Sequence, residues 1–71
     1  MITTDQLWLS KHALDKMEIE GIGVEQICEA IERGAKFEQT DGLLVKYSYF
    51  SVAYKQLNNK KYFIKTVFIN R

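Results

Sequence analysis

One histidine and two lysines cluster where the first predicted helix begins. His12 is the only histidine in the chain, Lys11 precedes it, and Lys16 follows one helical turn later. The first turn of a helix presents unpaired N–H groups and the positive end of the helix dipole, and both attract phosphate. Lysine adds a point charge to such a place, and a neutral imidazole can accept a proton near pH 7. These residue types in this spacing therefore indicate chemistry on a phosphodiester.

An ordinary structural role is the alternative for the same residues. A histidine at a helix boundary often does no more than hydrogen-bond a nearby backbone group. In that case His12, Lys11 and Lys16 are partly exposed surface groups. The residues by themselves leave both interpretations open.

An amphipathic helix must position these side chains. Ser10 is a favourable N-cap, and Gly21 is a favourable left-handed C-cap. Between them, apolar residues recur at helical spacing: Ala13, Leu14 and Met17. Steps of about 100° per residue place His12 and Lys16 together on one flank of this apolar side.

A second helix is predicted between Gly23 and Gly34. Its apolar residues fall at i, i+3, i+4 and i+7: Val24, Ile27, Cys28 and Ile31. Gly23 is the expected N-cap, and Gly34 ends the helix. Because Cys28 lies in the apolar stripe, we interpret it as a small core residue and not as a nucleophile. Two short helices joined by a tight glycine turn predict an αα-hairpin.

Three glutamates line another side of the second helix: Glu25, Glu29 and Glu32. Carboxylates can do acid–base chemistry, but a solvated face with Glu29 paired to Arg33 explains them as well. They also argue against a DNA-binding winged helix. The second helix would be the recognition helix of that fold, and its glutamates would face phosphates.

The chain beyond Gly34 is rich in aromatic and β-branched residues, which favours strands. Turn-forming residues stand at 40–42 and 58–59, and a bend is expected near Ser48–Ser51 because the stretch from 43 to 57 is too long for one strand. We predict antiparallel strands at about 35–39, 43–49, 50–57 and 61–69, with a short N-terminal edge strand at 7–9. The fold expected for this single domain (1–71) is α+β, an N-terminal αα-hairpin packed on one face of a three- to four-stranded antiparallel sheet.

The net charge of +1 conceals two oppositely charged halves. Residues 1–35 hold three basic against seven acidic residues, a net charge of −4, whereas residues 36–71 hold seven against two, a net charge of +5. In the second half, lysines alternate with aromatic residues. A sheet of this composition can stack unpaired bases while neutralising their phosphates. The alternative is an ordinary exposed sheet face whose lysines guard its edges against aggregation.

The composition also excludes several classes of protein. One cysteine provides no disulfide framework, and no cluster of Cys, His and carboxylates has metal-ligand spacing. The N-terminus lacks the basic start and apolar run of a secretion signal, and no stretch approaches membrane-spanning length. We therefore expect a cytoplasmic protein without a metal or other cofactor and without a membrane partner.

The segment HALDKMEIEGI (12–22) resembles the H-A-x-x-R-M-x-x-R-G-I signature of domain-of-unknown-function family 4258, a group of small prokaryotic proteins. A helix ending of the form I-x-x-A-I-x-x-G at 27–34 and a T-V-[YF] strand at 66–68 agree with it, so the resemblance covers residues 7–69. The chain departs from the pattern at Lys16 and Glu20, where arginines are usual, and at Phe68, where tyrosine is common. More distantly, the order of elements resembles the RelE-type toxin fold, whose members include ribonucleases that cleave messenger RNA.

This resemblance implies a RelE-like toxin-type domain that binds or cleaves single-stranded RNA without a metal. In the enzymatic version, His12 exchanges a proton with the 2′-hydroxyl or the leaving oxygen. Lys16, alone or with Lys65, stabilises the charge on the phosphorane, and Thr66 or Tyr54 positions the phosphate. The implied substrate-binding residues are Lys11, Tyr54 and Lys65. The three departures from the pattern imply a weakened site, since lysine lacks the bidentate geometry of arginine and Glu20 reverses a charge.

A non-enzymatic interaction module is the second hypothesis. It would form a homodimer, or bind an antitoxin-like partner protein, through its sheet. The short chain, the complementary charges of the two halves and the missing arginines motivate it, because self-association can stabilise a domain of this size. Trp8 is expected to be an anchor in the core or at such an interface.

Overall fold

The computed structural model describes residues 2–57 and 60–70. Its elements follow the predicted order, with two helices before the main strands. They are the 3₁₀ helix η1 (Thr4–Gln6), β1 (Leu7–Leu9), α1 (Lys11–Glu20), α2 (Val24–Arg33), β2 (Ala35–Gln39), β3 (Gly42–Tyr47), β4 (Phe50–Leu57) and β5 (Lys61–Ile69). The α+β class and the short N-terminal edge strand are confirmed.

The predicted capping residues bound both helices. Ser10 Oγ accepts a hydrogen bond from the N–H of Ala13 at 3.0 Å, and Gly21 adopts the left-handed conformation with φ 71°. The helix α2 starts after Gly23 and ends at Gly34, whose N–H donates to the Ala30 carbonyl at 2.7 Å. Local backbone chemistry alone therefore determines where each helix begins and ends.

The strands form one five-stranded sheet in the order β1-β5-β4-β3-β2. Strands β2 to β5 are antiparallel neighbours, but β1 pairs parallel to β5 through Leu7–Tyr62 and Leu9–Ile64. The prediction of three to four antiparallel strands is corrected to a mixed sheet of five. The parallel pair arises because β1 precedes both helices, and the chain returns beside it only in the last strand.

The predicted bend near 48–51 is a two-residue turn at Ser48–Tyr49 that separates β3 from β4. Ser48 has a φ of 55° in this turn. A further irregularity lies in the pairing of β4 with β5, where the register shifts between Ala53 and Tyr54 and leaves Lys65 without an opposite residue. The predicted turn at 58–59 lies outside the described residues.

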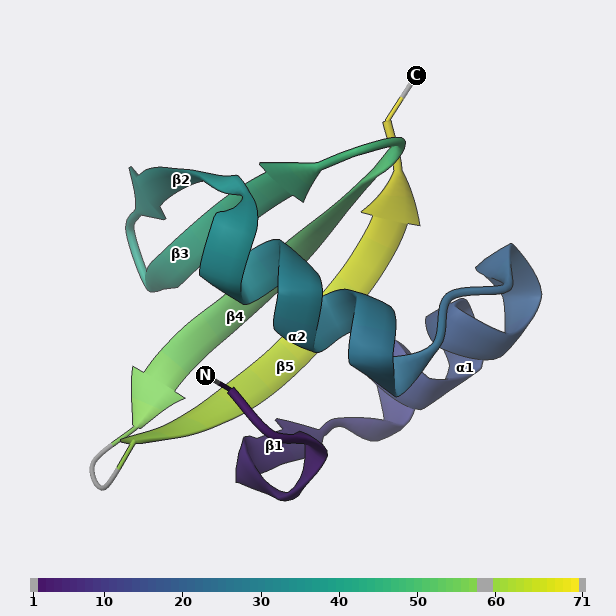
Figure 1. Cartoon of the computed structure of the whole chain (residues 1–71), viewed down its shortest axis with the longest axis horizontal. Helices are drawn as coiled ribbons and strands as arrows, with labels where there is room; N and C mark the ends of the chain where they lie inside the picture. The colour runs from purple at the N-terminus through teal and green to yellow at the C-terminus, as the bar shows by residue number, and fades with distance from the viewer. Residues whose placement is uncertain (1, 58–59, 71) are drawn as a thin grey trace.

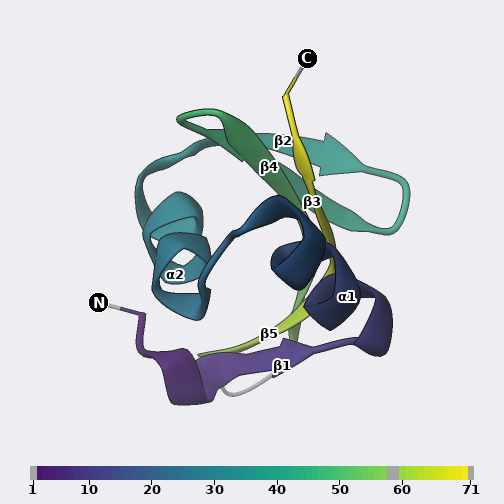
Figure 2. The same cartoon turned by 90° about the vertical axis from the view of Figure 1, so that its right-hand side faces the viewer.

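The two helices lie on the same side of the curved sheet, as Figures 1 and 2 show. The helix α2 contacts β3 and β4, whereas α1 packs against β5. They follow each other in the chain, as predicted for a helical hairpin, but each packs mainly on the sheet. Figure 2 shows the sheet wrapping around them, so that its other face carries no helix among the described residues.

The core lies between this side of the sheet and the helices. It holds the helix residues Ala13, Met17, Ile27, Cys28 and Ile31 and the strand residues Val45, Phe50, Val52, Tyr54, Ile64 and Val67. Cys28 is buried there, as predicted. One expectation was wrong, because Leu14 is 49% exposed. Trp8 is 56% exposed, so of its two expected roles the one in the core does not apply.

Gly34 joins α2 to β2 at a point where no side chain fits. A Cβ atom on this residue would lie 2.4 Å from the Val45 side chain and 2.6 Å from the Ala30 carbonyl. The close approach lets the chain turn directly from the helix into the sheet.

Candidate functional site

The start of α1 is attached to the middle of β5. The N–H of Ser10 donates to the Ile64 carbonyl at 3.1 Å, and its hydroxyl donates to the Lys65 carbonyl at 2.9 Å. Lys11 and His12 follow directly and are exposed to solvent. The structure therefore brings the start of α1 next to the backbone of Ile64 and Lys65, which lie far from it in the sequence.

The side chain of Lys65 turns away from this helix start. Its ammonium group donates to the carbonyl oxygen of Asp41 and lies 3.2 Å from the Asp41 carboxylate. Asp41 stands in the turn between β2 and β3, on the side of β5 that is occupied by β4. Lys55 contacts the same carboxylate at 3.5 Å. The hydrogen bond from Lys65, followed by the charge of Lys55, holds the pKa of Asp41 below its usual value of 3.8.

The predicted catalytic residues Thr66 and Lys16 take no part in this ion pair. Thr66 is half-buried on β5 opposite Ala53, and its hydroxyl makes only a long contact, 3.4 Å, to the Val67 carbonyl. Lys16 is half-buried on α1. Five of the six predicted residues thus lie on α1 or β5 without converging on one point, and the sixth, Tyr54, lies on β4.

Tyr54 corrects the predicted list of binding residues. Only 1% of this residue is exposed, and its ring packs edge-on against Tyr62 with the centroids 6.0 Å apart. Its pKa is raised because burial penalises the charged form, with a smaller contribution from Tyr62. Side chains alternate between the faces of a strand, and the register of β4 turns Tyr54 towards the helices. It is a core residue and cannot reach a ligand on the surface.

The sheet face without helices is the most distinctive surface of the molecule. Val45, Val52 and Val67 stand opposite one another and are buried beneath the helices. The residues that alternate with them along the strands must point to the opposite side, which we call the open face. Its main members are Trp8, Phe37, Leu44, Lys46, Ala53, Lys55, Lys61, Phe63, Lys65, Thr66 and Phe68.

Aromatic rings and lysines lie together on the open face. Trp8, Phe37 and Phe68 are 56%, 48% and 37% exposed. The ammonium group of Lys61 lies 5.7 Å from the centre of the Trp8 ring, and that of Lys46 lies 5.5 Å from the centre of the Phe37 ring. At these distances each lysine is attracted to the face of the ring and stays close to it.

Charge is separated between the two sides of the molecule. The open face and its adjoining turn hold four lysines and one carboxylate, that of Asp41, which gives a net charge of +3. The helices α1 and α2 together hold three basic and six acidic residues, a net charge of −3. The opposite charges of the two halves of the sequence thus become opposite charges of two faces.

Two of the three glutamates of α2, Glu29 and Glu32, have structural partners. Glu29 accepts a hydrogen bond from the Tyr47 hydroxyl at 3.0 Å and pairs with Arg33 at 3.7 Å, as predicted. The hydrogen bond to Glu29 raises the pKa of Tyr47. Glu32 accepts a hydrogen bond from the N–H of Ile2 at 2.7 Å. The predicted solvated face of this helix is therefore also an anchor for the N-terminal segment.

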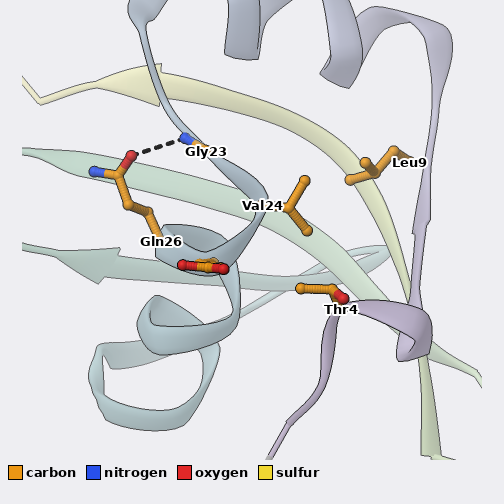
Figure 3. Close-up of a pocket in the computed structure, with 6 residues that line it drawn as sticks. Thr4, Leu9, Gly23, Val24 and Gln26 are labelled. Atoms are coloured by element: carbon orange, nitrogen blue, oxygen red, sulfur yellow. Dashed lines mark hydrogen bonds between the residues drawn. The ribbon is translucent and has the colours of Figure 1, made fainter.

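A shallow depression lies between the N-terminal segment and the start of α2 (Figure 3). The side chains of Thr4, Leu9 and Val24 line it, and the Gly23 N–H donates to Gln26 Oε1 at 2.7 Å beside it. This hydrogen bond already occupies the N–H group that an anion would need, and Glu25 also lines the depression. None of the predicted site residues lies there.

Sequence reasoning missed two members of the candidate site. Asp41 was interpreted only as a turn residue, and Trp8 as a core or interface anchor. The signal for Trp8 was its place between Leu7 and Leu9, because in an alternating strand the middle residue faces away from its neighbours. For Asp41 no local signal existed, since its two lysine partners belong to other strands.

Neither a family model, nor a curated protein, nor a solved structure matches this chain. Within residues 2–57 and 60–70, no cluster of three or more His, Cys, Asp or Glu side chains could hold a metal ion. The same part of the chain contains no helix with the length and apolar character needed to cross a membrane. The fold and site together define a small α+β protein with a basic, aromatic open face on its sheet.

Proposed function

We propose that the open face binds single-stranded RNA. The observation that carries this proposal is the pairing of exposed rings with lysines on the one sheet face that the helices leave uncovered. Exposed rings stack on unpaired bases of any sequence, and neighbouring lysines neutralise the phosphates that connect these bases. The proposal retains the RNA partner implied by the resemblance to RelE-type toxins and places the binding surface on the sheet.

The arrangement favours a single strand over a duplex. Trp8 and Phe37 lie on the two outermost strands of the sheet, with Phe63 and Leu44 on the strands between them. Stacking on such dispersed rings requires bases that are not already stacked on each other. The hydrogen-bonded ladder of β3, β4 and β5 supports these side chains.

The start of α1 extends the proposed surface. Ser10 holds it against β5 through the carbonyls of Ile64 and Lys65, so Lys11 and His12 stand beside the strand that carries Lys61 and Lys65. In an enzymatic version, His12 accepts the proton of a 2′-hydroxyl group and Lys16 stabilises the charge on the phosphate. RNA binding on the open face does not depend on this step.

Fluorescence anisotropy of labelled RNA tests the binding proposal. We expect binding to a single-stranded oligonucleotide and weaker binding to a duplex of the same length. The logarithm of the binding constant should fall linearly with the logarithm of the salt concentration, with a slope of about −0.7 for each phosphate contacted. Trp8→Ala and Lys46→Gln should each weaken binding. Ile19→Ala and Arg33→Gln are the matched controls, because they remove an exposed apolar group and a charge from the helices and should leave affinity unchanged.

Gel analysis of the same mixtures tests the enzymatic version. Cleavage that is lost in His12→Ala while binding persists would support the role of His12. Cleavage that persists in His12→Ala would contradict it. If the protein shows no salt-sensitive binding to RNA, or if Trp8→Ala and Ile19→Ala behave alike, the open face is not an RNA-binding surface.

A further inference from the structure

One of the two edges of the sheet is formed by β2. This strand ends the strand order, all five of its residues are exposed, and its register with β3 is regular from Ala35 to Gln39. Figure 1 shows no described segment of the chain beyond it. The sequence contains no proline that could block the edge. An uninterrupted edge of this kind pairs readily with another strand.

The ladder of the sheet determines which residues of β2 face outward. The two-residue turn at Ser48–Tyr49 makes alternate residues of β3 bond to β4, namely Tyr47, Val45 and Leu43. The intervening residues of β3 bond to β2, at Ala35, Phe37 and Gln39. The N–H and C=O groups of Lys36 and Glu38 therefore point towards the free edge.

Few registers allow two copies of this edge to pair around a two-fold axis. Residues whose N–H and C=O groups point to the free edge must stand opposite each other. In the first register Lys36 stands opposite Lys36 of the partner subunit, and in the second Glu38 stands opposite Glu38 of the partner subunit. In the third, Lys36 stands opposite Glu38 of the partner subunit. The first two registers bring like charges together. Only the third places opposite charges across the junction, and the symmetry repeats this pair.

We propose that the protein forms a symmetric dimer through β2. Lys36 stands opposite Glu38 of the partner subunit, and Phe37 stands opposite Phe37 of the partner subunit. The two five-stranded sheets then form one continuous sheet of ten strands. The partner is a second copy of this chain because the edge is complementary to itself in both charge and hydrogen-bonding pattern.

This dimer can be tested separately from the proposed binding of RNA, although Phe37 belongs to both surfaces. Lys36 and Glu38 stand opposite Val45 and Leu43, which face the helices, so their side chains lie on the helix side of the edge. Changing them leaves the open face intact. The two proposals can therefore fail separately.

Charge-reversal variants of Lys36 and Glu38 test the proposed register of the dimer. Sedimentation equilibrium measures the dissociation constant of each variant. The wild type is expected to associate to a dimer. Lys36→Glu and Glu38→Lys each place like charges opposite one another twice, and each should raise the dissociation constant about tenfold or more. The double variant restores both pairs with their signs exchanged, so its dissociation constant should return to within about threefold of the wild type.

A cysteine cross-link tests the same geometry independently. In a Cys28→Ala background, Phe37→Cys places two thiols opposite each other at the two-fold axis, where oxidation should join them. Gln39→Cys is the control, because residue 39 stands opposite residue 35 and should not cross-link. A wild type that is monomeric at every concentration, a double reversal that fails to restore association, or equal cross-linking of both cysteine variants would overturn the proposal.

Discussion

The carboxylate of Asp41 lies among the lysines of the open face and should weaken its binding to RNA. It contacts Lys65 at 3.2 Å and Lys55 at 3.5 Å, and its own side chain is 72% exposed. Asp41→Asn keeps the shape of the side chain and the backbone carbonyl that also accepts from Lys65. The substitution removes one negative charge, so the net charge of the face rises from +3 to +4.

The expected gain in affinity follows from the strength of exposed charge pairs. One such interaction in water changes an equilibrium constant by about two- to fivefold at moderate salt, so Asp41→Asn should bind single-stranded RNA tighter by that factor. Each lysine released from Asp41 can contact a phosphate. For every lysine that does so, the slope of the logarithm of the binding constant against the logarithm of the salt concentration should become steeper by about 0.7. Glu18→Gln on α1 is the control, because it makes the same change of charge on the helix side.

Low pH is a second way to remove this negative charge, because it protonates the Asp41 carboxylate. The hydrogen bond from Lys65 and the charge of Lys55 lower the pKa of Asp41 in the folded protein from 3.8. The carboxylate therefore contributes stability above that value, and the contribution is lost as the pH falls through the lower folded pKa. Over that acid range the wild type should approach the affinity of Asp41→Asn, whose own binding should change less.

Anisotropy titrations at several salt concentrations measure both the affinity for RNA and its salt dependence. If folded Asp41→Asn binds RNA with unchanged affinity and unchanged salt dependence, Asp41 does not lie at the binding surface. If Glu18→Gln gives the same gain as Asp41→Asn, only net charge matters and the open face has no special role.

Three further predictions concern stability and reactivity. Gly34→Ala should lower the free energy of unfolding by about 1–3 kcal/mol in urea titrations, since its Cβ meets packed atoms. At Gly23 the nearest atom is 3.6 Å away, so Gly23→Ala should lower this free energy by less, through the poorer N-cap alone. Burial, followed by the charges of Glu32 and Glu25, raises the pKa of the Cys28 thiol, so it should react with a thiol reagent only after unfolding, and rapid reaction in the native state would contradict this. Burial also raises the pKa of Tyr54, so its contribution to stability should be complete below its unfolded pKa of 10.0 and lost as the pH rises through the folded value, a decline that Tyr54→Phe should reduce.

The ends of the two helices could be predicted from local sequence, whereas the burial of their side chains could not. Both begin and end at the predicted residues, because a cap depends only on one side chain and the backbone next to it. The i,i+4 pair of Glu29 with Arg33 was predictable for the same reason. Leu14 was misplaced because helical spacing defines an apolar side without showing how much of that side the sheet covers.

The candidate site required information that local patterns do not contain. Tyr54, which the resemblance implied as a substrate-binding residue, belongs to the core because the register of β4 with β3 and β5 determines its side of the sheet. A shift of one residue would have exchanged the two faces. Asp41 likewise joined the site only through contacts with strands that lie far along the chain.

The sequence by itself determined the two helices, the strand-forming second half and the core position of Cys28. These follow from backbone preferences and from periodicity, which act over a few residues. Only the tertiary structure decided that β1 runs parallel to β5, that Trp8 and Phe37 share an uncovered face with four lysines, and that β2 leaves its edge free. Those features depend on which distant strands pair and in which register, and long-range packing settles both.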